Sequence, residues 1–393
     1  MQPVLDIIIV GGGPVGLALA NALLQSKFKF RVIEAQRPAL SWPNDSQSLR
    51  VSALNCATQK LMSDLAVWDS ILQSGASRFD KMYVWDAVSR GAISLAAEEV
   101  GEADLGFIVE NRALQRALWQ AVAKQDSEAL LIERCKKLSH DGQVWHLQLS
   151  SGVSLCSKLV VGADGVNSWL RRQVGIVSRP VWYGQRAIVA NVQTERMHER
   201  TACQRFLPSG PLAFLPLKDP RQCSIVWTVP EAEAQGLCDL AEPEFNRRLT
   251  AAFAAHLGNV EVLSDRASFP LMHQHAAQYV LPGVALLGDA AHSIHPLAGQ
   301  GVNLGFADAK NLAEVLLAAH ELGRPFASLS NLQRYERERR GSNALMLKAM
   351  NGFNGLFSND QAALSGLRGL GLSLVDKLGV IKKVCIKTAM GLA

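Results

Sequence analysis

The order of apolar and polar positions at the start of the chain predicts a strand, a helix and a second strand. Residues 5–10 form a short run rich in β-branched side chains that ends in glycines. Residues 15–25 carry the small and aliphatic side chains of a helix packed on a sheet, and residues 31–34 are typical of the next parallel strand. Together the three segments predict a βαβ unit of about 30 residues.

Further along, the pattern changes to that of an antiparallel layer. Short strand-like pieces at 82–85, 92–95 and 106–109 are separated by charged turns, which favours such a layer over further βαβ units. A second strand-rich region covers residues 185–229, where prolines and glycines mark the turns. We expect the two regions to form one second sheet.

Other apolar segments predict that the chain returns to the first sheet. Residues 112–124 should form a helix, residues 158–161 and 284–287 resemble buried strands, and the pattern after residue 329 is helical. The sequence therefore predicts an α/β fold, in which a Rossmann-like domain is interleaved with a smaller antiparallel β-sheet domain and followed by a C-terminal helical segment. The expected ranges are 1–75, 105–180 and 278–340 for the first domain, 76–104 and 181–277 for the second, and 341–393 for the helical segment.

Composition narrows the class of protein. Of the 393 residues, 48% are hydrophobic and 19% are charged, which favours a globular protein over a disordered one. The net charge of +5 is small and no block of Lys or Arg occurs, so nucleic acid is not expected as a partner. The seven cysteines are scattered without a Cys-x-x-Cys pair, which favours a reducing cytoplasm. Glycines interrupt the apolar stretch at residues 5–24, so we expect neither a signal peptide nor a spanning helix.

A glycine fingerprint marks the first turn. Gly11-x-Gly13-x-x-Gly16 lies between the predicted strand and helix. Its glycines permit a tight turn, the close approach of a pyrophosphate to backbone, and close packing of helix on strand. Glu34 follows 18 residues after Gly16, where an acid can bind ribose hydroxyls. The sequence therefore predicts a dinucleotide site, to which we also assign the neighbouring residues Pro14, Val15 and Ala35.

Two further segments resemble a known family. Residues 159–168 run from an apolar strand into Asp164 and Gly165, and residues 288–305 run from a strand end through a glycine-rich turn into a helix. With the fingerprint, they resemble the three motifs of flavoprotein monooxygenases of the para-hydroxybenzoate hydroxylase type. The resemblance implies FAD as the cofactor, with Asp164 and Gly165 near its pyrophosphate and the route of the nicotinamide.

The third segment supplies groups that suit a flavin. Asp289 can bind ribityl hydroxyls, and backbone N–H groups near residues 299–303 can stabilise negative charge on a reduced ring. The resemblance also places Arg50, Asn111 and Pro296 at the cofactor, although many relatives carry Arg at the position of Asn111. From the glycine-rich turn we include Gly299, Gln300, Gly301, Val302 and Asn303 among the cofactor-binding residues.

A closer resemblance, over essentially the whole chain, is to the hydroxylases of ubiquinone biosynthesis. It rests on residues 105–111 with Leu114, and on 210–217, 292–305 and 380–392. It implies hydroxylation of a polyprenyl quinol, at the demethoxyubiquinol step, through a flavin C4a-hydroperoxide formed from molecular oxygen. The alternatives are another ring position of the same pathway and a noncatalytic FAD-bound scaffold. A flavin reductase or halogenase is a further rival, although the Trp-x-Trp-x-Ile-Pro signature of halogenases is absent.

Several roles stay open at this point. One dinucleotide fingerprint implies that NAD(P)H, the expected reductant, binds transiently at the domain interface, and no pattern identifies a general base. The aromatic residues of the second sheet either cover the flavin ring or belong to the core; they are Phe206, Phe214 and Trp227. We expect no metal, because the pairs His273/His275 and His292/His295 lack an accompanying carboxylate cluster.

The C-terminal end has a basic amphipathic pattern. Between residues 367 and 392, leucine, isoleucine and valine recur among lysines. Such a helix either docks on the cytoplasmic face of the inner membrane, where a prenylated substrate resides, or packs on the body of the protein or on another subunit. A homo-oligomer and a multi-enzyme biosynthetic complex are therefore both open as assemblies.

Overall fold

The first sheet of the protein is built around parallel strands, as the βαβ pattern predicts. The computed structural model describes residues 3–42, 48–89, 91–293, 301–357 and 379–392. In this part of the chain the sheet has eight strands, and β8, β2, β1, β11 and β19 are parallel neighbours in that order. The strands are β1 (Val4–Val10), β2 (Phe30–Glu34), β8 (Leu130–Ile132), β9 (Cys135–His140), β10 (Trp145–Leu149), β11 (Ser154–Gly162), β18 (Val280–Leu281) and β19 (Val284–Leu286).

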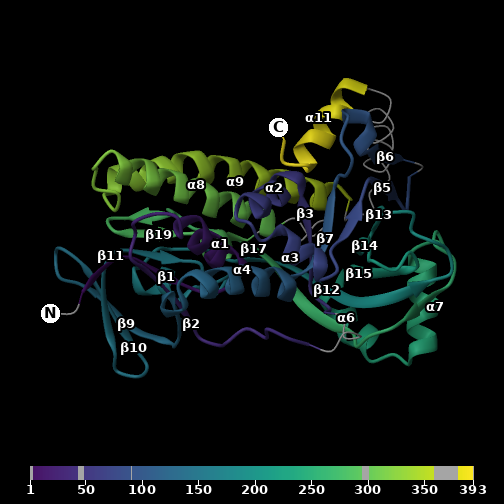
Figure 1. The fold of residues 1–393 in the computed structure, drawn as a ribbon. Coiled ribbons are helices and arrows are strands. Elements are labelled where there is room, and N and C mark those ends of the chain that lie inside the picture. The colour runs from purple at the N-terminus through teal and green to yellow at the C-terminus, as the bar shows by residue number, and fades with distance from the viewer. Residues whose placement is uncertain (1–2, 43–47, 90, 294–300, 358–378, 393) are drawn as a thin grey trace.

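Helices cover this sheet and enclose the largest apolar core. Helix α1 packs against both α4 and α8, and α8 and α9 lie side by side along the sheet (Figure 1). The core joins residues of β1, β2 and β11 to the buried faces of these helices. The helices are α1 (Pro14–Leu23), α2 (Cys56–Asp64), α3 (Trp68–Gln73), α4 (Asn111–Gln125), α5 (Trp169–Gln173), α8 (Gly301–Glu321) and α9 (Leu329–Phe357), and a short 3-10 turn η2 (Ser127–Ala129) follows α4.

The second sheet is antiparallel except at one pair, where β13 and β5 run parallel. Alternate residues of its strands, such as Ile188 and Ile225, pack with α6 (Glu231–Cys238) and α7 (Glu242–Ala252) in a separate core. The strands are β5 (Lys81–Asp86), β6 (Ala92–Ala96), β12 (Val181–Thr194), β13 (Thr201–Leu207), β14 (Gly210–Pro216), β15 (Gln222–Pro230), β16 (Val260–Val262), β17 (Ala267–His275) and β20 (His292–Ser293). The predicted fold class is thus confirmed, while the domain boundaries stay a prediction.

A small third sheet lies between the two. Its strands β3 (Val51–Asn55), β7 (Gly106–Glu110) and β4 (Ser77–Phe79) are antiparallel in the order β3-β7-β4. The prediction that residues 106–109 share a sheet with residues 82–85 is therefore wrong. The reason is a close approach: a Cβ at Gly106 would lie 2.3 Å from the carbonyl oxygen of Leu54, so glycine lets β7 pair with β3.

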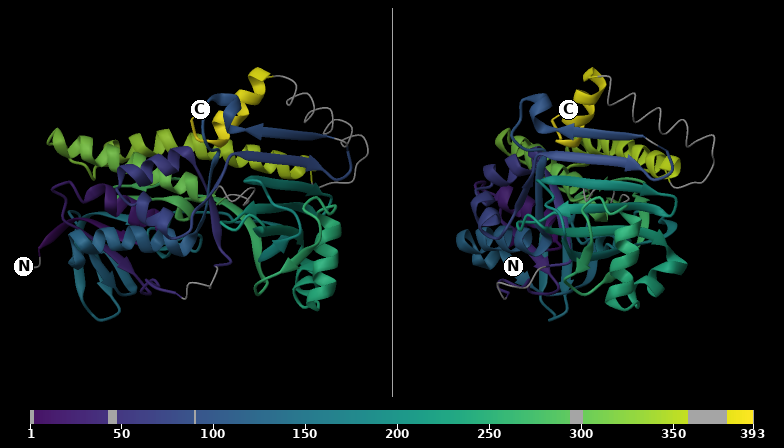
Figure 2. Two further views of the ribbon diagram at one scale, coloured as in Figure 1. Left: turned by 45° about the vertical axis from the view of Figure 1, so that its right-hand side comes forward. Right: turned by 90° about the vertical axis from the view of Figure 1, so that its right-hand side faces the viewer.

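The C-terminal helix α11 (Gly379–Ala389) packs on the body of the protein. Ile386 and Met390 are completely buried in a core shared by the second and third sheets. Lys382 Nζ lies 3.0 Å from Glu99 Oε2, in the 3-10 turn η1 (Ala97–Val100), and α11 stands beside β6 (Figure 2). Among the described helices, none combines the length and apolar character needed to cross a bilayer.

Candidate cofactor and active site

The first turn of the sheet needs glycine at two positions. Gly11 has a φ of +110°, and a Cβ there would lie 2.4 Å from the carbonyl oxygen of Ala163 on the neighbouring connection. A Cβ at Gly16 would lie 2.1 Å from the carbonyl oxygen of Gly11. These contacts bring α1 directly against the ends of β1 and β11, and the positive φ of Gly11 turns the chain between them.

Gly13 plays a different part. Apart from its neighbours in the chain, no described residue lies within 4 Å of a Cβ built on it, and its backbone (φ −72°, ψ 173°) is one that any residue adopts. Gly13 caps α1 without a side-chain hydrogen bond, and Pro14 follows it. The space beside Gly13 at the start of α1 therefore fits the pyrophosphate of a dinucleotide, which the N–H groups of a first helical turn can bind.

Glu34 is held at the end of β2 by backbone donors. The Gly12 N–H donates to Oε2 over 2.7 Å, and the Gln36 N–H donates to Oε1 over 3.0 Å. Gln115 of α4 fixes the same turn by donating to the carbonyl of Gly12 over 2.7 Å. Each carboxylate oxygen keeps a lone pair for a ribose hydroxyl. Ala35, next to Glu34, is exposed.

Asp164 and Gly165 form the turn between β11 and α5. The Leu170 N–H donates to Asp164 Oδ2 over 3.0 Å, while Oδ1 is buried without a partner in the described part of the chain. Gly165 has a φ of +80°, which favours glycine. The nearby Arg171 donates to the carbonyl of Ala290 over 2.7 Å and so ties this segment to the third one.

Asp289 and Arg50 come from distant segments of the chain, and they lie close enough for the charge of Arg50 to affect the carboxyl of Asp289. Asp289, in the 3-10 turn η3 (Gly288–Ala290), is exposed on one side, yet the surrounding protein raises the pKa of its carboxyl above the ordinary value. The charges of His292 and Arg50 oppose that rise. The guanidinium of Arg50 lies 4.4 Å from the ring centre of Phe269 on β17, so it contacts the second sheet by a cation–π interaction.

The start of α8 is anchored to the third sheet. Asn303 donates from Nδ2 to the carbonyl of Ala53 over 2.8 Å and accepts the Asn55 N–H over 3.1 Å. Its side chain is thus used within the protein, where it fixes the first turn of α8 against β3.

Asn111 links the start of α4 to the segment of Arg50 and Ser52. Its Oδ1 accepts a hydrogen bond from the hydroxyl of Ser52 over 2.7 Å, and its backbone N–H donates to the carbonyl of Arg50 over 3.0 Å. Pro296, Gly299, Gln300 and His295 lie outside the described residues.

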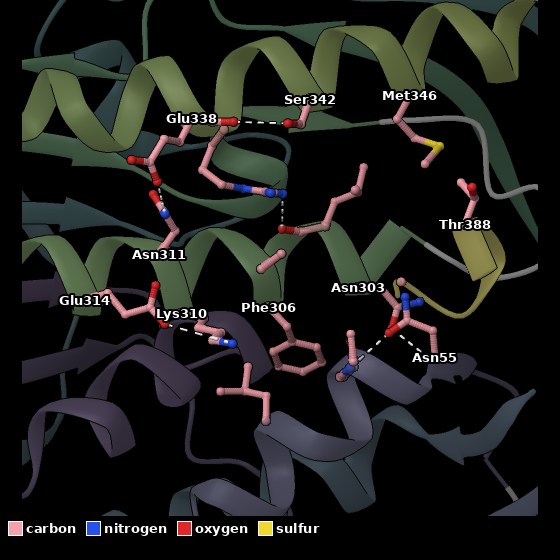
Figure 3. A pocket seen from close by; sticks show the side chains of 17 residues that line it. Asn55, Asn303, Phe306, Lys310, Asn311, Glu314, Glu338, Ser342, Met346 and Thr388 are labelled. Atoms are coloured by element: carbon pink, nitrogen blue, oxygen red, sulfur yellow. Dashed lines mark hydrogen bonds and ion pairs between the residues drawn. The ribbon is translucent and has the colours of Figure 1, made fainter. Parts of the chain in front are cut away.

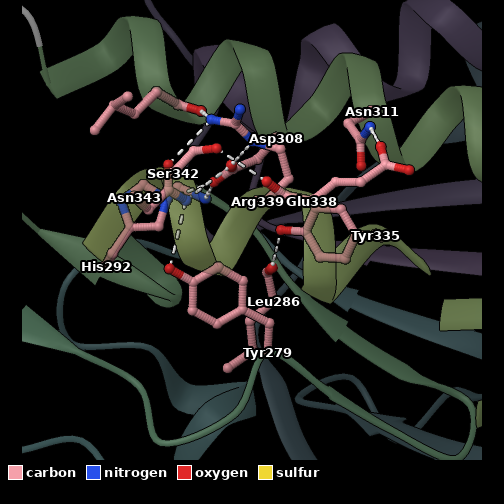
Figure 4. A network of polar contacts seen from close by, with 12 residues as sticks. Tyr279, Leu286, His292, Asp308, Asn311, Tyr335, Glu338, Arg339, Ser342 and Asn343 are labelled. Atoms are coloured by element: carbon pink, nitrogen blue, oxygen red, sulfur yellow. Dashed lines mark hydrogen bonds and ion pairs between the residues drawn. The ribbon is translucent and has the colours of Figure 1, made fainter. Parts of the chain in front are cut away.

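A network of buried polar side chains lies beneath η3, and no pattern in the sequence predicts it (Figure 4). Asp308 of α8 is fully buried and accepts the Gly288 N–H over 3.1 Å, while its Oδ2 lies 2.5 Å from His292 Nε2. From α9, Arg339 and Asn343 donate to Asp308 Oδ1 over 2.7 and 3.1 Å. Asp308 follows the glycine-rich turn, but nothing in the sequence pairs it with residues of α9.

Most of the other histidine and aromatic side chains singled out in the sequence contact other residues of the protein. His275 contacts the hydroxyl of Tyr279 over 2.7 Å, and no group of three metal-binding side chains occurs among the described residues. Phe214 and Trp227 point into the core under α6 and α7, where Phe214 stacks on Phe253 at 3.7 Å. They do not cover a flavin ring. Strand alternation places Phe206 on the opposite face of the sheet, since Arg205 contacts α7.

A cavity of about 500 Å³ lies between α2, α8, α9 and α11 (Figure 3). It adjoins the cofactor site at Asn303 and the buried network at Arg339, but the glycines of the first turn do not line it. Its walls mix the charged side chains of Lys310 and Glu338 with apolar ones such as Phe306. This mixture of polar and apolar walls identifies no particular ligand.

A Rossmann-like sheet with this turn, Glu34 and Asp289 at its carboxyl edge defines a dinucleotide-dependent enzyme. The FAD binding domain family matches residues 4–349. The chain is 38% identical to 3-demethoxyubiquinol 3-hydroxylase of Escherichia coli over 98% of each chain. It is also 38% identical to ubiquinone hydroxylase UbiL of Rhodospirillum rubrum, over 99% of this chain and 90% of that one. The chain therefore belongs to the FAD-dependent monooxygenases, in the branch of the ubiquinone-biosynthesis hydroxylases.

Solved structures agree on the fold. The p-nitrophenol 4-monooxygenase PnpA of Pseudomonas putida superposes with a TM-score of 0.80 at 19% identity, over 100% of this chain and 99% of that one. The anhydrotetracycline hydroxylase OxyS of Streptomyces rimosus gives 0.73 at 21% identity, over 99% of this chain and 76% of that one. At these identities the likeness concerns the fold alone.

Proposed function

We propose that this protein hydroxylates the ring of a demethoxyubiquinol, a polyprenylated quinol, with NAD(P)H as reductant and molecular oxygen as co-substrate. The observation that carries the proposal is the likeness to the Escherichia coli 3-demethoxyubiquinol 3-hydroxylase over 98% of both chains. A match that includes the β-sheet domain as well as the cofactor motifs favours a shared substrate class over a shared cofactor alone.

The residues of the site fit FAD. The start of α1 at Gly13 would receive the pyrophosphate, Glu34 the adenosine ribose, and Asp289 the ribityl hydroxyls. The buried, unpaired Asp164 Oδ1 offers one more acceptor, which suits a cofactor hydroxyl or a bound water. FAD, when bound, supplies the electron transfer and oxygen activation that no amino-acid side chain provides.

The protein's own residues position the reactants and limit water. Arg50 holds the cofactor segment against β17 through Phe269, and Asn303 fixes the start of α8 against β3. The N–H groups at the start of that helix would favour negative charge on a flavin ring held there. The second and third sheets share a buried apolar cluster, which would help to keep water from a quinol ring bound beside them. No general base is assigned.

Two alternatives keep the same cofactor site. Another ring position of the same pathway would require only a different placement of the quinol, and a noncatalytic FAD-bound scaffold would need no placement. The substrate's prenyl tail favours a cytoplasmic protein held peripherally at the inner membrane, alone or within a biosynthetic complex.

Complementation tests the proposal. In a bacterium that lacks its demethoxyubiquinol hydroxylase, expression of this chain should replace accumulated demethoxyubiquinone by ubiquinone, measured by mass spectrometry of extracted quinones. The Gly13→Asp variant, which puts a negative charge where the pyrophosphate is expected, should not rescue. Rescue only in a strain that accumulates an earlier phenol would move the reaction to another ring position, and failure in every pathway strain would favour the scaffold.

A further inference from the structure

A cysteine, a histidine and an aspartate contact one another on the first sheet. Cys156 of β11 stands opposite His146 of β10 in the antiparallel ladder, and its Sγ lies 3.2 Å from His146 Nδ1. His146 Nε2 lies 2.6 Å from Oδ2 of Asp141, in the turn that joins β9 to β10. In this trio a nucleophile contacts a base, and the base contacts a carboxylate, which is the arrangement that activates a thiol.

The trio is remote from the sites described above. Cys156 pairs with Val4 at the start of β1, whereas the turn at Gly11 follows the end of that strand. The hairpin of β9 and β10 lies at the end of the molecule away from the second sheet (Figure 1). Other residues line the cavity between α2, α8, α9 and α11. The trio therefore has no part in the proposed binding of FAD.

Asp141 is held in place as a carboxylate. Its Oδ1 accepts the N–H groups of Val144 and Gln143 over 2.9 and 2.8 Å. The bond from Val144 contributes most, and that from His146 next, to a pKa of Asp141 well below the ordinary value of 3.8. An ionised carboxylate only accepts hydrogen bonds, so Nε2 of His146 carries the proton and Nδ1 keeps its lone pair. That lone pair faces the thiol of Cys156.

The thiol is partly open to solvent. Alternation along β10 places His146 on the face opposite to the core, because its neighbour Leu147 is fully buried in the core of the first sheet. Cys156, directly across from His146, shares that face. Both side chains are half-buried, and Asp141 is exposed. A small molecule in solution can therefore reach the sulfur.

The neighbours of the trio on this face add little net charge. Ser139 of β9 and Val4 of β1 flank the trio in the ladder, and both are uncharged. Lys158, further along β11 on the same face, forms an ion pair with Asp6 over 2.9 Å, so its charge is balanced. Asp141 therefore supplies the negative charge that favours a protonated imidazole in the trio.

The other cysteines with described side chains are in surroundings that keep them protonated. Burial raises the thiol pKa to about 11 for Cys56 and to about 12 for Cys135 and Cys203. Burial also raises the pKa of Cys223 and that of Cys238. Since the thiolate is the nucleophile, these five should react slowly at neutral pH.

We propose that Cys156 is a reactive-thiol site, with His146 as its base and Asp141 as a positioning residue, which small electrophiles such as hydrogen peroxide modify. The thiol gives its proton to His146 Nδ1, and the thiolate sulfur attacks one oxygen of the peroxide. An S–O bond forms as the O–O bond breaks, and the imidazolium returns the proton to the leaving hydroxide, which becomes water. Sulfur loses two electrons and the peroxide gains two, so the product is a sulfenic acid.

Two labelling measurements on the FAD-loaded enzyme test the site. Alkylation by iodoacetamide at neutral pH, followed by peptide mass spectrometry, gives the rate at each cysteine. Dimedone, added after a pulse of hydrogen peroxide, traps sulfenic acid. We expect Cys156 to be alkylated about tenfold faster than Cys56, and the dimedone label to fall on the peptide of Cys156. Cys156→Ser should remove that label and leave the FAD content unchanged.

Asp141→Asn tests the positioning role. The Asn side-chain oxygen still accepts the N–H groups of the turn, but its amide nitrogen donates towards His146 Nε2. Nδ1 then takes the proton and no longer accepts one from the thiol. We expect the alkylation rate of Cys156 to fall about tenfold, together with the ultraviolet absorbance of its thiolate, while the midpoint of urea unfolding stays unchanged. Asp6→Asn, which removes a carboxylate from the same face, is the matched control and should alter neither signal.

Three results overturn the proposal. The first is an alkylation rate at Cys156 no higher than at Cys56, and the second is an Asp141→Asn variant that is labelled as fast as the wild type. The third is a slower rate in Asp6→Asn equal to that in Asp141→Asn, because the effect would then come from surface charge in general.

Discussion

His292 Nε2 and Asp308 Oδ2 lie 2.5 Å apart in the interior, with side chains 3% and 0% exposed. The contact joins β20, just before the glycine-rich turn, to the middle of α8. Because Asp308 also accepts the Gly288 N–H and the Arg339 guanidinium, one carboxylate fixes both ends of the segment that carries Asp289.

Replacing Asp308 by Asn should therefore be costly. The change leaves the Arg339 side chain, which is 15% exposed, without its counter-charge, and breaking a buried pair in this way destabilises by about 3–5 kcal/mol. We expect Asp308→Asn to lower the free energy of unfolding by that amount and to reduce the FAD content of the purified protein. Glu314→Gln is the control on the same helix, since Glu314 is exposed and should shift stability by less than about 0.5 kcal/mol.

The effect should also depend on pH. Burial opposes the charge of Asp308, but His292 and Arg339 outweigh burial and hold the pKa of Asp308 below its ordinary value of 3.8. A carboxyl with a lowered folded-state pKa contributes stability that is complete above 3.8 and is lost as the pH falls through the lowered value. The stability gap between wild type and Asp308→Asn should thus narrow below that pH, in urea unfolding measured at several pH values. A gap that widens in acid would contradict the assigned charge.

Gly13 and Gly16 should respond differently to alanine. A Cβ at Gly16 meets the carbonyl oxygen of Gly11 at 2.1 Å, so Gly16→Ala should destabilise the apoprotein by about 1–3 kcal/mol. Gly13→Ala meets no described atom within 4 Å and should change stability by less than about 0.5 kcal/mol. Yet it should weaken FAD binding about tenfold, because its Cβ occupies the pyrophosphate approach. Urea unfolding of the apoproteins and titration of FAD fluorescence measure the two effects, and unchanged FAD affinity in Gly13→Ala would refute the placement of the pyrophosphate.

The C-terminal helix allows its packing and its expected membrane contact to be tested separately. Ile386 is fully buried, and truncating such a side chain to Ala costs about 2–5 kcal/mol, which thermal unfolding would detect. Val384 is 56% exposed, so Val384→Asp should leave stability within about 0.5 kcal/mol. If α11 docks on membrane, Val384→Asp should also reduce co-sedimentation with anionic phospholipid vesicles. Unaltered co-sedimentation would remove this face of α11 as the membrane contact.

Features that depend on residues close together in the chain can be predicted from the sequence. The βαβ unit follows from local apolar periodicity, and the first turn follows from glycine at positions where φ is +110° or where a Cβ would collide with backbone. Short spacing also placed Glu34 at the end of β2, next to the turn that it contacts. These features all lie within the first βαβ unit. Backbone sterics and the spacing of apolar residues are therefore enough to predict them.

Features that join distant segments depend instead on how the chain packs in three dimensions. Alternation along β14 and β15 shows that successive residues face opposite sides, but the position of α6 and α7 decides that Phe214 and Trp227 are core. Likewise, no periodicity pairs Asp308 with Arg339, which lies 31 residues away on another helix. Burial is a property of what packs on a face, and the partner of a buried charge is set by the fold, so neither can be derived from local pattern alone.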